Sequence, residues 1–149
     1  MNVQKWLESV KEMDDQINDM LAERAQLWAL ATSTTAKPMD GMPFDNTGTV
    51  SRKMENAVCA YIDLDKKIDA LIDRFIDRKR QVLLAVQKLP ELEEDVLYRH
   101  YIKYEPWAQI AAEMGCSRMQ LWRIRQRAYD TIYSVEGLHV TTICGKMYL

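Results

Sequence analysis

The sequence predicts an all-α protein, with an N-terminal antiparallel coiled-coil helical hairpin and a C-terminal three-helix module that contains a helix-turn-helix. Only five Gly and four Pro occur among 149 residues, and long runs contain neither, which favours helices. Residues 1–31 and 51–88 carry apolar side chains at heptad spacing. Residues 107–126 have the small residue, the glycine and the apolar spacing of two helices joined by a tight turn. We therefore expect a hairpin over 1–88, the three-helix module over 89–133 and a tail over 134–149.

The first expected helix runs from about residue 2 to residue 31. Its apolar stripe follows heptad spacing and skips one position, which Arg24 occupies; the stripe consists of Trp6, Val10, Met13, Ile17, Met20 and Leu27. A helix with such a stripe is stable only when the stripe packs on a partner.

Two segments break the helical pattern. Residues 32–50 hold two Pro, two Gly and many Ser, Thr and Asp, so we interpret them as a long, mobile loop between the first two helices. A functional role for this loop stays open, as a weaker interpretation. Near the end of the chain, residues 139–144 form a β-prone run between two glycines, and their partner is open.

The second expected helix starts near residue 50 and reaches residue 88, without Gly or Pro. At 1.5 Å per residue it is ~57 Å long, whereas the first helix is ~45 Å. Its stripe is Val50, Met54, Ala57, Tyr61, Leu64, Ile68, Leu71, Phe75, Val82, Val86 and Leu89. The first helix carries a net charge of −3 and the second +3, which suits antiparallel pairing. The part of the second helix that extends beyond the first needs another cover, which predicts a homodimer. The basic run Arg78–Arg80 is either solvated or contacts phosphate.

Three shorter helices are expected over 90–102, 106–114 and 117–133. Pro90 suits the first turn of the first of them, and the acidic residues that follow it favour the positive helix end. The expected apolar face of this helix is Leu92, Val96, Leu97 and Tyr101. Pro106 opens the next helix.

The spacing over 107–126 predicts a helix-turn-helix. Ala111 is small where a second helix would cross, and Gly115 tolerates the positive φ of the turn. Leu121 and Ile124 supply the inward face of the second helix. Ser117 and Gln120 form the S-x-x-Q pattern of a capping box, in which each residue satisfies a backbone amide of the other.

The second helix of this motif also carries four arginines, with no acidic residue before Asp130. Arginine suits phosphate and guanine, glutamine suits adenine, and exposed amides at a helix start can hold phosphate. The candidate DNA-binding residues are Ser117, Arg118, Met119, Gln120, Trp122, Arg123, Gln126 and Arg127. An ordinary solvated helix face is the simpler alternative, and Trp122 could instead pack in the core.

Other classes of protein fit the sequence poorly. No apolar run reaches the ~20 residues of a membrane span, and the acidic start does not fit a signal peptide, so we expect a cytoplasmic protein. Cys59, Cys116 and Cys144 are scattered, which predicts reduced thiols and no metal site. His100 and Tyr101 have no convergent acid or cysteine, so we expect neither catalysis nor a cofactor.

The run 89–132 resembles region four of sigma-70-type factors, the module that reads promoter DNA. The matching residues are Leu89, Pro90, Val96, Leu97, Tyr101, Ile110, Ala111, Gly115, Ser117, Arg118, Leu121, Ile124 and Ala128. Departures are Tyr104, where glycine is usual nearby, Pro106 in place of Ser or Thr, and Met119-Gln120 in place of charged residues. In layout, residues 1–133 resemble RinA/ArpU-type phage transcriptional regulators.

The resemblance implies a DNA-binding regulator of a phage or mobile element, associated with late-gene transcription. It would act in the cytoplasm of a bacterial host cell, on double-stranded DNA and together with host RNA polymerase. The homodimer is expected from the long apolar stripe of residues 51–88. Two alternatives stay open. A small-terminase-like packaging protein would use the same motif in a ring-shaped oligomer, and an interaction protein would bind polymerase without reading DNA.

Overall fold

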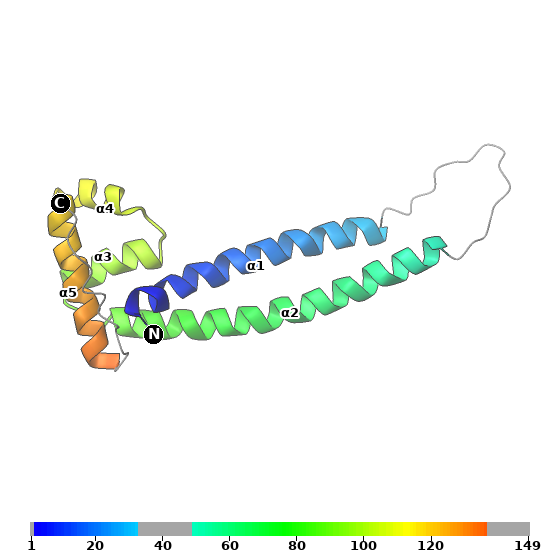
Figure 1. Cartoon of the computed structure of the whole chain (residues 1–149), viewed down its shortest axis with the longest axis horizontal. Helices are drawn as coiled ribbons and strands as arrows, with labels where there is room; N and C mark the ends of the chain where they lie inside the picture. The colour runs from blue at the N-terminus through cyan, green and yellow to red at the C-terminus, as the bar shows by residue number, and fades with distance from the viewer. Residues whose placement is uncertain (1, 33–48, 137–149) are drawn as a thin grey trace. The chain divides into compact units, whose positions relative to one another are not determined.

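The computed structural model describes residues 2–32 and 49–136, and all of its regular structure there is helical (Figure 1). The all-α fold class is therefore confirmed. The helices are α1 (Val3–Thr32), α2 (Thr49–Val86), α3 (Glu91–Tyr101), α4 (Trp107–Met114) and α5 (Arg118–Glu136). Most of the expected 32–50 loop and the β-prone run 139–144 lie outside the described residues. None of the five helices has the length and apolarity to span a membrane.

The helix ends differ slightly from those expected. Pro90 and Pro106 both have extended backbone and cap α3 and α4, so each helix begins one residue later. The Pro90 carbonyl accepts the N–H of Glu94 at 2.8 Å, and the Pro106 carbonyl accepts that of Ile110 at 3.2 Å. Because proline lacks an N–H, it is well placed at these helix starts. At the other end, α5 runs to Glu136, three residues beyond the predicted end at 133.

The chain divides into two compact units, and the division differs from the predicted boundary at residue 88. One unit combines Met1–Asp14 with the chain from Phe75 onward, and the other is Asp15–Arg74. We call them the terminal unit and the central unit. Both long helices therefore contribute residues to both units.

In the central unit, α1 and α2 pack along the predicted stripes. Leu64 and Ile68 are buried on α2, and Ile17 and Ala31 on α1. Arg24, at the skipped position of the first stripe, donates to Asp65. In this ion pair the cation comes from α1, the helix with net negative charge, and the carboxylate comes from α2. The rings of Trp28 and Tyr61 are 5.5 Å apart. From Arg24–Asp65 to Trp28–Tyr61 the partners step in opposite directions along the chain, as in an antiparallel pair.

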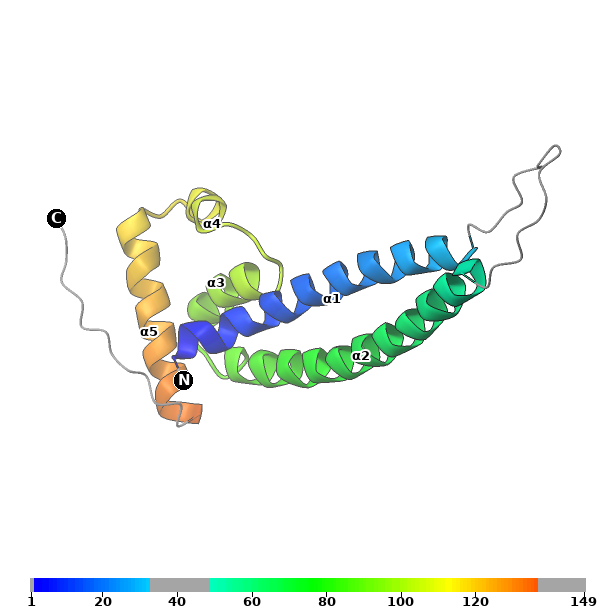
Figure 2. The ribbon, with the colours of Figure 1, turned by 45° about the vertical axis from the view of Figure 1, so that its right-hand side comes forward.

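The core of the terminal unit joins the first turns of α1 and the last turns of α2 to α3 and α5 (Figure 2). Its buried residues are Val3, Trp6, Leu7, Val10, Val82, Ala85, Val86, Leu89, Leu97, Tyr101, Ala128, Tyr129 and Ile132. The C-terminal part of the second stripe is therefore covered within the chain. Met54, near the start of α2, is exposed instead. The predicted stripe therefore needs no second protomer to cover its C-terminal part, because α1, α3 and α5 already cover it.

A second core lies beneath the α4–α5 turn. It consists of Val96, Ile110, Ala111, Leu121 and Ile124, and the ring of Trp107 packs against both cores. The predicted inward position of Leu92 is wrong, because Leu92 is 49% exposed and Glu93 is buried instead. Helix α3 buries positions 93, 96, 97 and 101, so its inward face is displaced by one residue at the first turn.

The link between α3 and α4 contains a strained residue. Tyr104 has φ of 60°, and is the sole non-glycine residue in the described ranges with positive φ. Glycine would adopt this conformation without a side-chain penalty. The ammonium of Lys11 on α1 lies 5.9 Å from the centre of its ring.

Candidate nucleic-acid interface

The turn between α4 and α5 has the geometry that the sequence predicts. Gly115 ends α4 with φ of 62° and ψ of 26°, in the left-handed region. The N–H of Gly115 donates to Ala112 at 3.3 Å, and that of Cys116 donates to Ala111 at 3.1 Å. This pair of bonds is a Schellman motif, which satisfies the last carbonyls of a helix. A Cβ at Gly115 would meet no atom within 4 Å, so the backbone conformation is the only demand for glycine here.

The predicted capping box at the start of α5 is confirmed. The N–H of Ser117 donates to the side-chain oxygen of Gln120 at 2.8 Å, and the N–H of Gln120 donates to the Ser117 hydroxyl at 3.2 Å. Both backbone amides are therefore occupied. A phosphate could not use them without displacing the cap, whereas the amide NH2 of Gln120 takes no part in the capping box and could donate to a base or a phosphate.

The remaining candidate residues form the outward side of α5. Met119 is 59% exposed and Trp122 is 49% exposed, so Trp122 does not pack in the core. Arg118, Arg123 and Arg127 are exposed, and Gln126 is half-buried. Leu121, Ile124 and Ala128 face inward and are buried, as predicted. The predicted outward side is therefore open to solvent.

Two hollows flank this outward side. One, of about 290 Å³, is lined by Trp107, Ala108, Arg118, Leu121, Trp122 and Arg125. The other, of about 390 Å³, is lined by Leu92, Met114, Cys116, Gln120, Arg123, Ile124 and Arg127. Each hollow has two arginines beside an apolar floor. The arginines therefore leave α5 on both sides of the face that Met119 and Gln126 occupy.

Arg125 is a candidate site residue that the sequence prediction missed. Its guanidinium lies 5.1 Å from the ring centre of Trp107 and 5.9 Å from that of Tyr129. Its Nε is buried and has no hydrogen-bond partner among the described residues. The signal was present in the spacing, because Arg118, Trp122 and Arg125 stand at i, i+4 and i+7 and so share one helix face.

The Trp107 ring that contacts Arg125 is itself stacked on the ring of His100. The rings of His100 and Trp107 are stacked with centres 3.7 Å apart. Nδ1 of His100 lies 2.8 Å from the Glu105 carbonyl, so the neutral ring donates from Nδ1. Burial lowers the pKa of His100 below its ordinary value, which outweighs the opposite effect of the bond to Glu105. Contacts of the neutral His100 ring with Glu105 and Trp107, and of Trp107 with Arg125, therefore connect α3, the α3–α4 link, α4 and α5.

Two further contacts hold the module together. The Tyr101 and Tyr129 hydroxyls hydrogen-bond inside the core, and burial raises the pKa of both. Arg99 on α3 lies 3.1 Å from Asp95 and 2.7 Å from Glu113 on α4. Hydrogen bonding from Gln109, together with the charge of Arg99, lowers the pKa of Glu113. Helices α4 and α5 are therefore positioned from α3.

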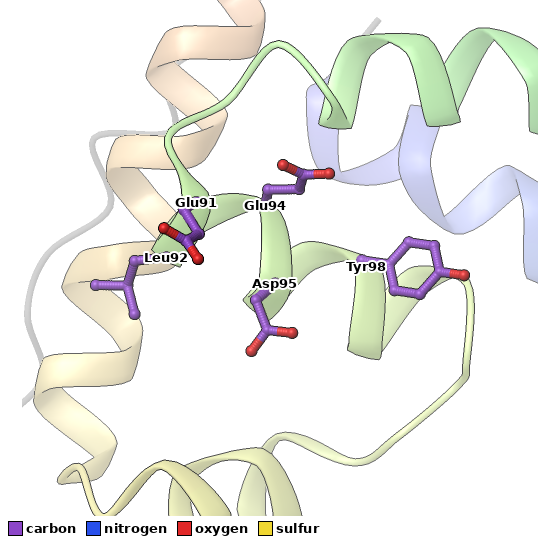
Figure 3. A pocket seen from close by; sticks show the side chains of 5 residues that line it. All are labelled: Glu91, Leu92, Glu94, Asp95 and Tyr98. Atoms are coloured by element: carbon purple, nitrogen blue, oxygen red, sulfur yellow. The ribbon is translucent and has the colours of Figure 1, made fainter.

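The opposite kind of surface lies on α3. A hollow of about 600 Å³ is lined by Glu91, Leu92, Glu94, Asp95 and Tyr98 (Figure 3). Figure 3 shows Leu92 pointing toward α5, with Glu91 and Asp95 beside it. Its carboxylates would repel phosphate, so this surface does not belong to a nucleic-acid interface.

The described residues hold neither a metal-binding cluster nor a pair of bonded cysteines. They include no cluster of three or more His, Cys, Asp or Glu side chains that could hold a metal ion. Cys59 and Cys116 are free thiols.

Comparisons of the chain with protein-family models, curated proteins and solved structures found no match.

Proposed function

We propose that this protein is a sequence-specific DNA-binding transcriptional regulator of the RinA/ArpU type, from a phage or mobile element. In this proposal, α5 enters the major groove and reads bases, while residues around it hold the backbone. The protein acts as a homodimer with host RNA polymerase, as a late-gene activator.

The observation that carries the proposal is the outward side of α5. An arginine-rich face is presented by a capped helix whose start is set by a left-handed glycine turn. The inward residues of α5 are buried in a core shared with α3 and α4. The outward side chains therefore project from a helix whose position is fixed by packing. Such support is what base recognition needs, since a bidentate contact tolerates little misplacement.

The four arginines are assigned by their surroundings. Arg123 and Arg127 are exposed beside Gln120, and we assign Arg123 to a base and Arg127 to phosphate. Arg118 and Arg125 border the hollow of the two tryptophans, where Arg125 is held over Trp107. We assign these two to the backbone of the same duplex, because a held guanidinium suits a fixed phosphate.

One alternative has a specific observation in its favour. Met119 and Trp122 are large, apolar and exposed on the same side of α5, and exposed aromatic residues are common centres of protein interfaces. A protein that binds polymerase through this face without reading DNA would also use them. The packaging alternative remains a prediction without an observation of its own.

Selection from random-sequence duplex DNA, followed by anisotropy titration of the enriched sequence, tests the proposal. We expect enrichment of one sequence family, and an affinity that falls with salt as counterions are released. Arg127→Ala should reduce the salt slope by about one while leaving the preferred sequence unchanged. No enrichment and no DNA affinity at low salt, together with binding to purified RNA polymerase, would replace this proposal by the polymerase-binding alternative.

A further inference from the structure

A hollow on α2 has no partner within the described part of the chain. It is lined by Ile76, Lys79, Arg80, Leu83, Leu84 and Gln87, and has a volume of about 400 Å³. Ile76 is 51% exposed and Leu84 is 54% exposed, whereas Val82, Ala85 and Val86 face the core. The hollow therefore lies on the side of α2 that the predicted stripe does not use. We call it the basic hollow, because Lys79 and Arg80 line it beside its apolar residues.

The acidic surface of α3 has matching properties. Its hollow combines Glu91, Glu94 and Asp95 with two exposed apolar side chains, Leu92 and Tyr98. Asp95 is paired with Arg99, so Glu91 and Glu94 carry most of the outward negative charge. The five labelled side chains of Figure 3 all come from α3. We call this surface the acidic face.

We propose that the basic hollow of one copy of this chain receives the acidic face of a second copy, and that the contact is made twice around a two-fold axis. This inference rests on the homodimer of the proposed function and gives it a surface. Leu92 and Tyr98 would cover Ile76 and Leu84, while Glu91 and Glu94 would lie against Lys79 and Arg80. Both surfaces belong to the terminal unit, so one compact body carries both halves of the contact.

Charge decides between possible occupants. If two α2 hollows met each other, Lys79 and Arg80 of both copies would lie near the axis and repel. DNA would satisfy the two cations, but it offers little to cover Ile76 and Leu84. An acidic partner with apolar side chains satisfies both demands, and the acidic face of α3 supplies both. A two-fold arrangement uses both surfaces of both copies and leaves neither open for further growth.

Charge reversal with rescue tests the inference in the full-length protein. One variant combines Lys79→Glu with Arg80→Glu, and the other combines Glu91→Lys with Glu94→Lys. Each variant alone should place like charges against each other and weaken dimerisation on the order of 100-fold or more. An equimolar mixture restores opposite charges in both contacts, so sedimentation equilibrium should give monomers for each variant and a dimer for the mixture.

A matched control reverses charges elsewhere on α2. Lys66→Glu with Lys67→Glu changes two exposed residues of the central unit and should leave the dimer mass unchanged. Circular dichroism of every variant checks folding. If the lysine substitutions unfold α3 by opposing its helix dipole, Glu91→Gln with Glu94→Gln replaces them. This neutral variant should still weaken the dimer. Leu84→Ser, which removes an apolar side chain from the basic hollow, should weaken it as well.

Each other outcome overturns the inference in a distinct way. A monomeric wild-type protein at tens of micromolar would remove the homodimer of the proposed function as well. A dimer that survives both charge reversals would keep the homodimer but move it to another surface. Folded variants whose mixture stays monomeric would show that the two surfaces do not meet. Loss of DNA affinity with an unchanged dimer mass would assign Lys79 and Arg80 to phosphate.

Discussion

The arginines of α5 show how the surroundings of a residue set what it can do. Arg123 is exposed at the edge of a hollow that has a glutamine beside it. Arg125, two residues later, is half-buried between two aromatic rings. An exposed guanidinium can turn to a base edge, whereas a stacked one keeps its direction. Replacing Arg125 would also remove packing, so a test of base reading belongs at Arg123.

Arg123→Ala should weaken binding to the selected duplex without unfolding the protein. A bidentate contact with a base is worth about 1–3 kcal/mol, and its loss should relax the preference at one base pair. Anisotropy titration against the selected duplex and its single-base variants measures both effects. Arg74→Ala, at an exposed arginine of the central unit, is the matched control and should change neither. Unchanged affinity with a normal helical signal would remove Arg123 from the interface.

His100 should make the stability of the terminal unit depend on pH. Because burial lowers the folded-state pKa of His100 below its unfolded value of about 6.5, the unfolded chain binds more protons as the pH falls. The stabilisation is complete above that unfolded pKa and is lost as the pH falls from it toward the folded pKa. Thermal melts between about pH 7.5 and about pH 5.5 should show a falling melting temperature.

His100→Phe isolates this contribution, because the ring keeps its stacking on Trp107 and cannot titrate. The variant should lose part of the pH dependence, and the carboxylates account for what remains. It also loses the bond to the Glu105 carbonyl, so its melting temperature at neutral pH should be lower than that of the wild type. Equal pH dependence in the two proteins would mean that His100 is as easily protonated when folded as when unfolded.

At the scale of elements, the α4–α5 turn depends on local backbone rules. Gly115 supplies a left-handed residue, and Ser117 and Gln120 close the capping box one turn later. The hydrogen bonds of the turn lie between neighbours in sequence, so they form wherever these two helices are held. The angle at which α5 leaves the turn, and so the direction of Arg118, depends on this segment.

Gly115→Val should destabilise the terminal unit by about 1–3 kcal/mol and weaken DNA binding. The structure assigns the whole cost to backbone strain, because a Cβ at this position has open space around it. Gly115→Asn is the matched control, since asparagine adopts the left-handed region more readily than other side chains. Urea denaturation should therefore rank the free energy of unfolding as wild type, then Asn, then Val. Equal stability of the Val and Asn variants would contradict the left-handed turn.

At the scale of the whole molecule, the module of α3, α4 and α5 is not supported by its own three helices alone. The core that contains Leu97, Ala128 and Ile132 is completed by side chains from the first turns of α1 and the last turns of α2. The Lys11–Tyr104 contact adds a link from α1 to the strained residue before α4. A fragment that starts at residue 89 would expose the apolar surface that these turns cover.

Leu7→Ala should therefore destabilise the module that carries α5, although Leu7 is more than a hundred positions away in sequence. Leu7 is fully buried, and truncation of such a side chain costs about 2–5 kcal/mol. Val58→Ala, at an exposed apolar residue of the central unit, is the control and should cost far less. Hydrogen exchange should show faster exchange of the α5 amides in Leu7→Ala. Unchanged protection of α5 would mean that α1 does not support the module.

Much of the fold and of the site follows from local rules, and these the sequence alone determines. The helix spans follow from apolar periodicity, with errors of at most three residues at the ends. The capping box of Ser117 and Gln120 and the left-handed Gly115 depend only on residues within one turn of each other. The inward and outward sides of α5 follow from spacing as well, which is why the exposed candidates could be named in advance.

What the sequence leaves open depends on which elements meet, and only the tertiary structure decides it. Periodicity marks an apolar face but not its partner, so it did not predict that α1 and α2 complete the core beneath α5. At the first turn of α3, packing buries Glu93 and exposes Leu92, because the direction from which neighbours approach selects the inward side. Arg125 becomes a candidate site residue for the same reason, since Trp107 and Tyr129 come together around it only in the folded chain.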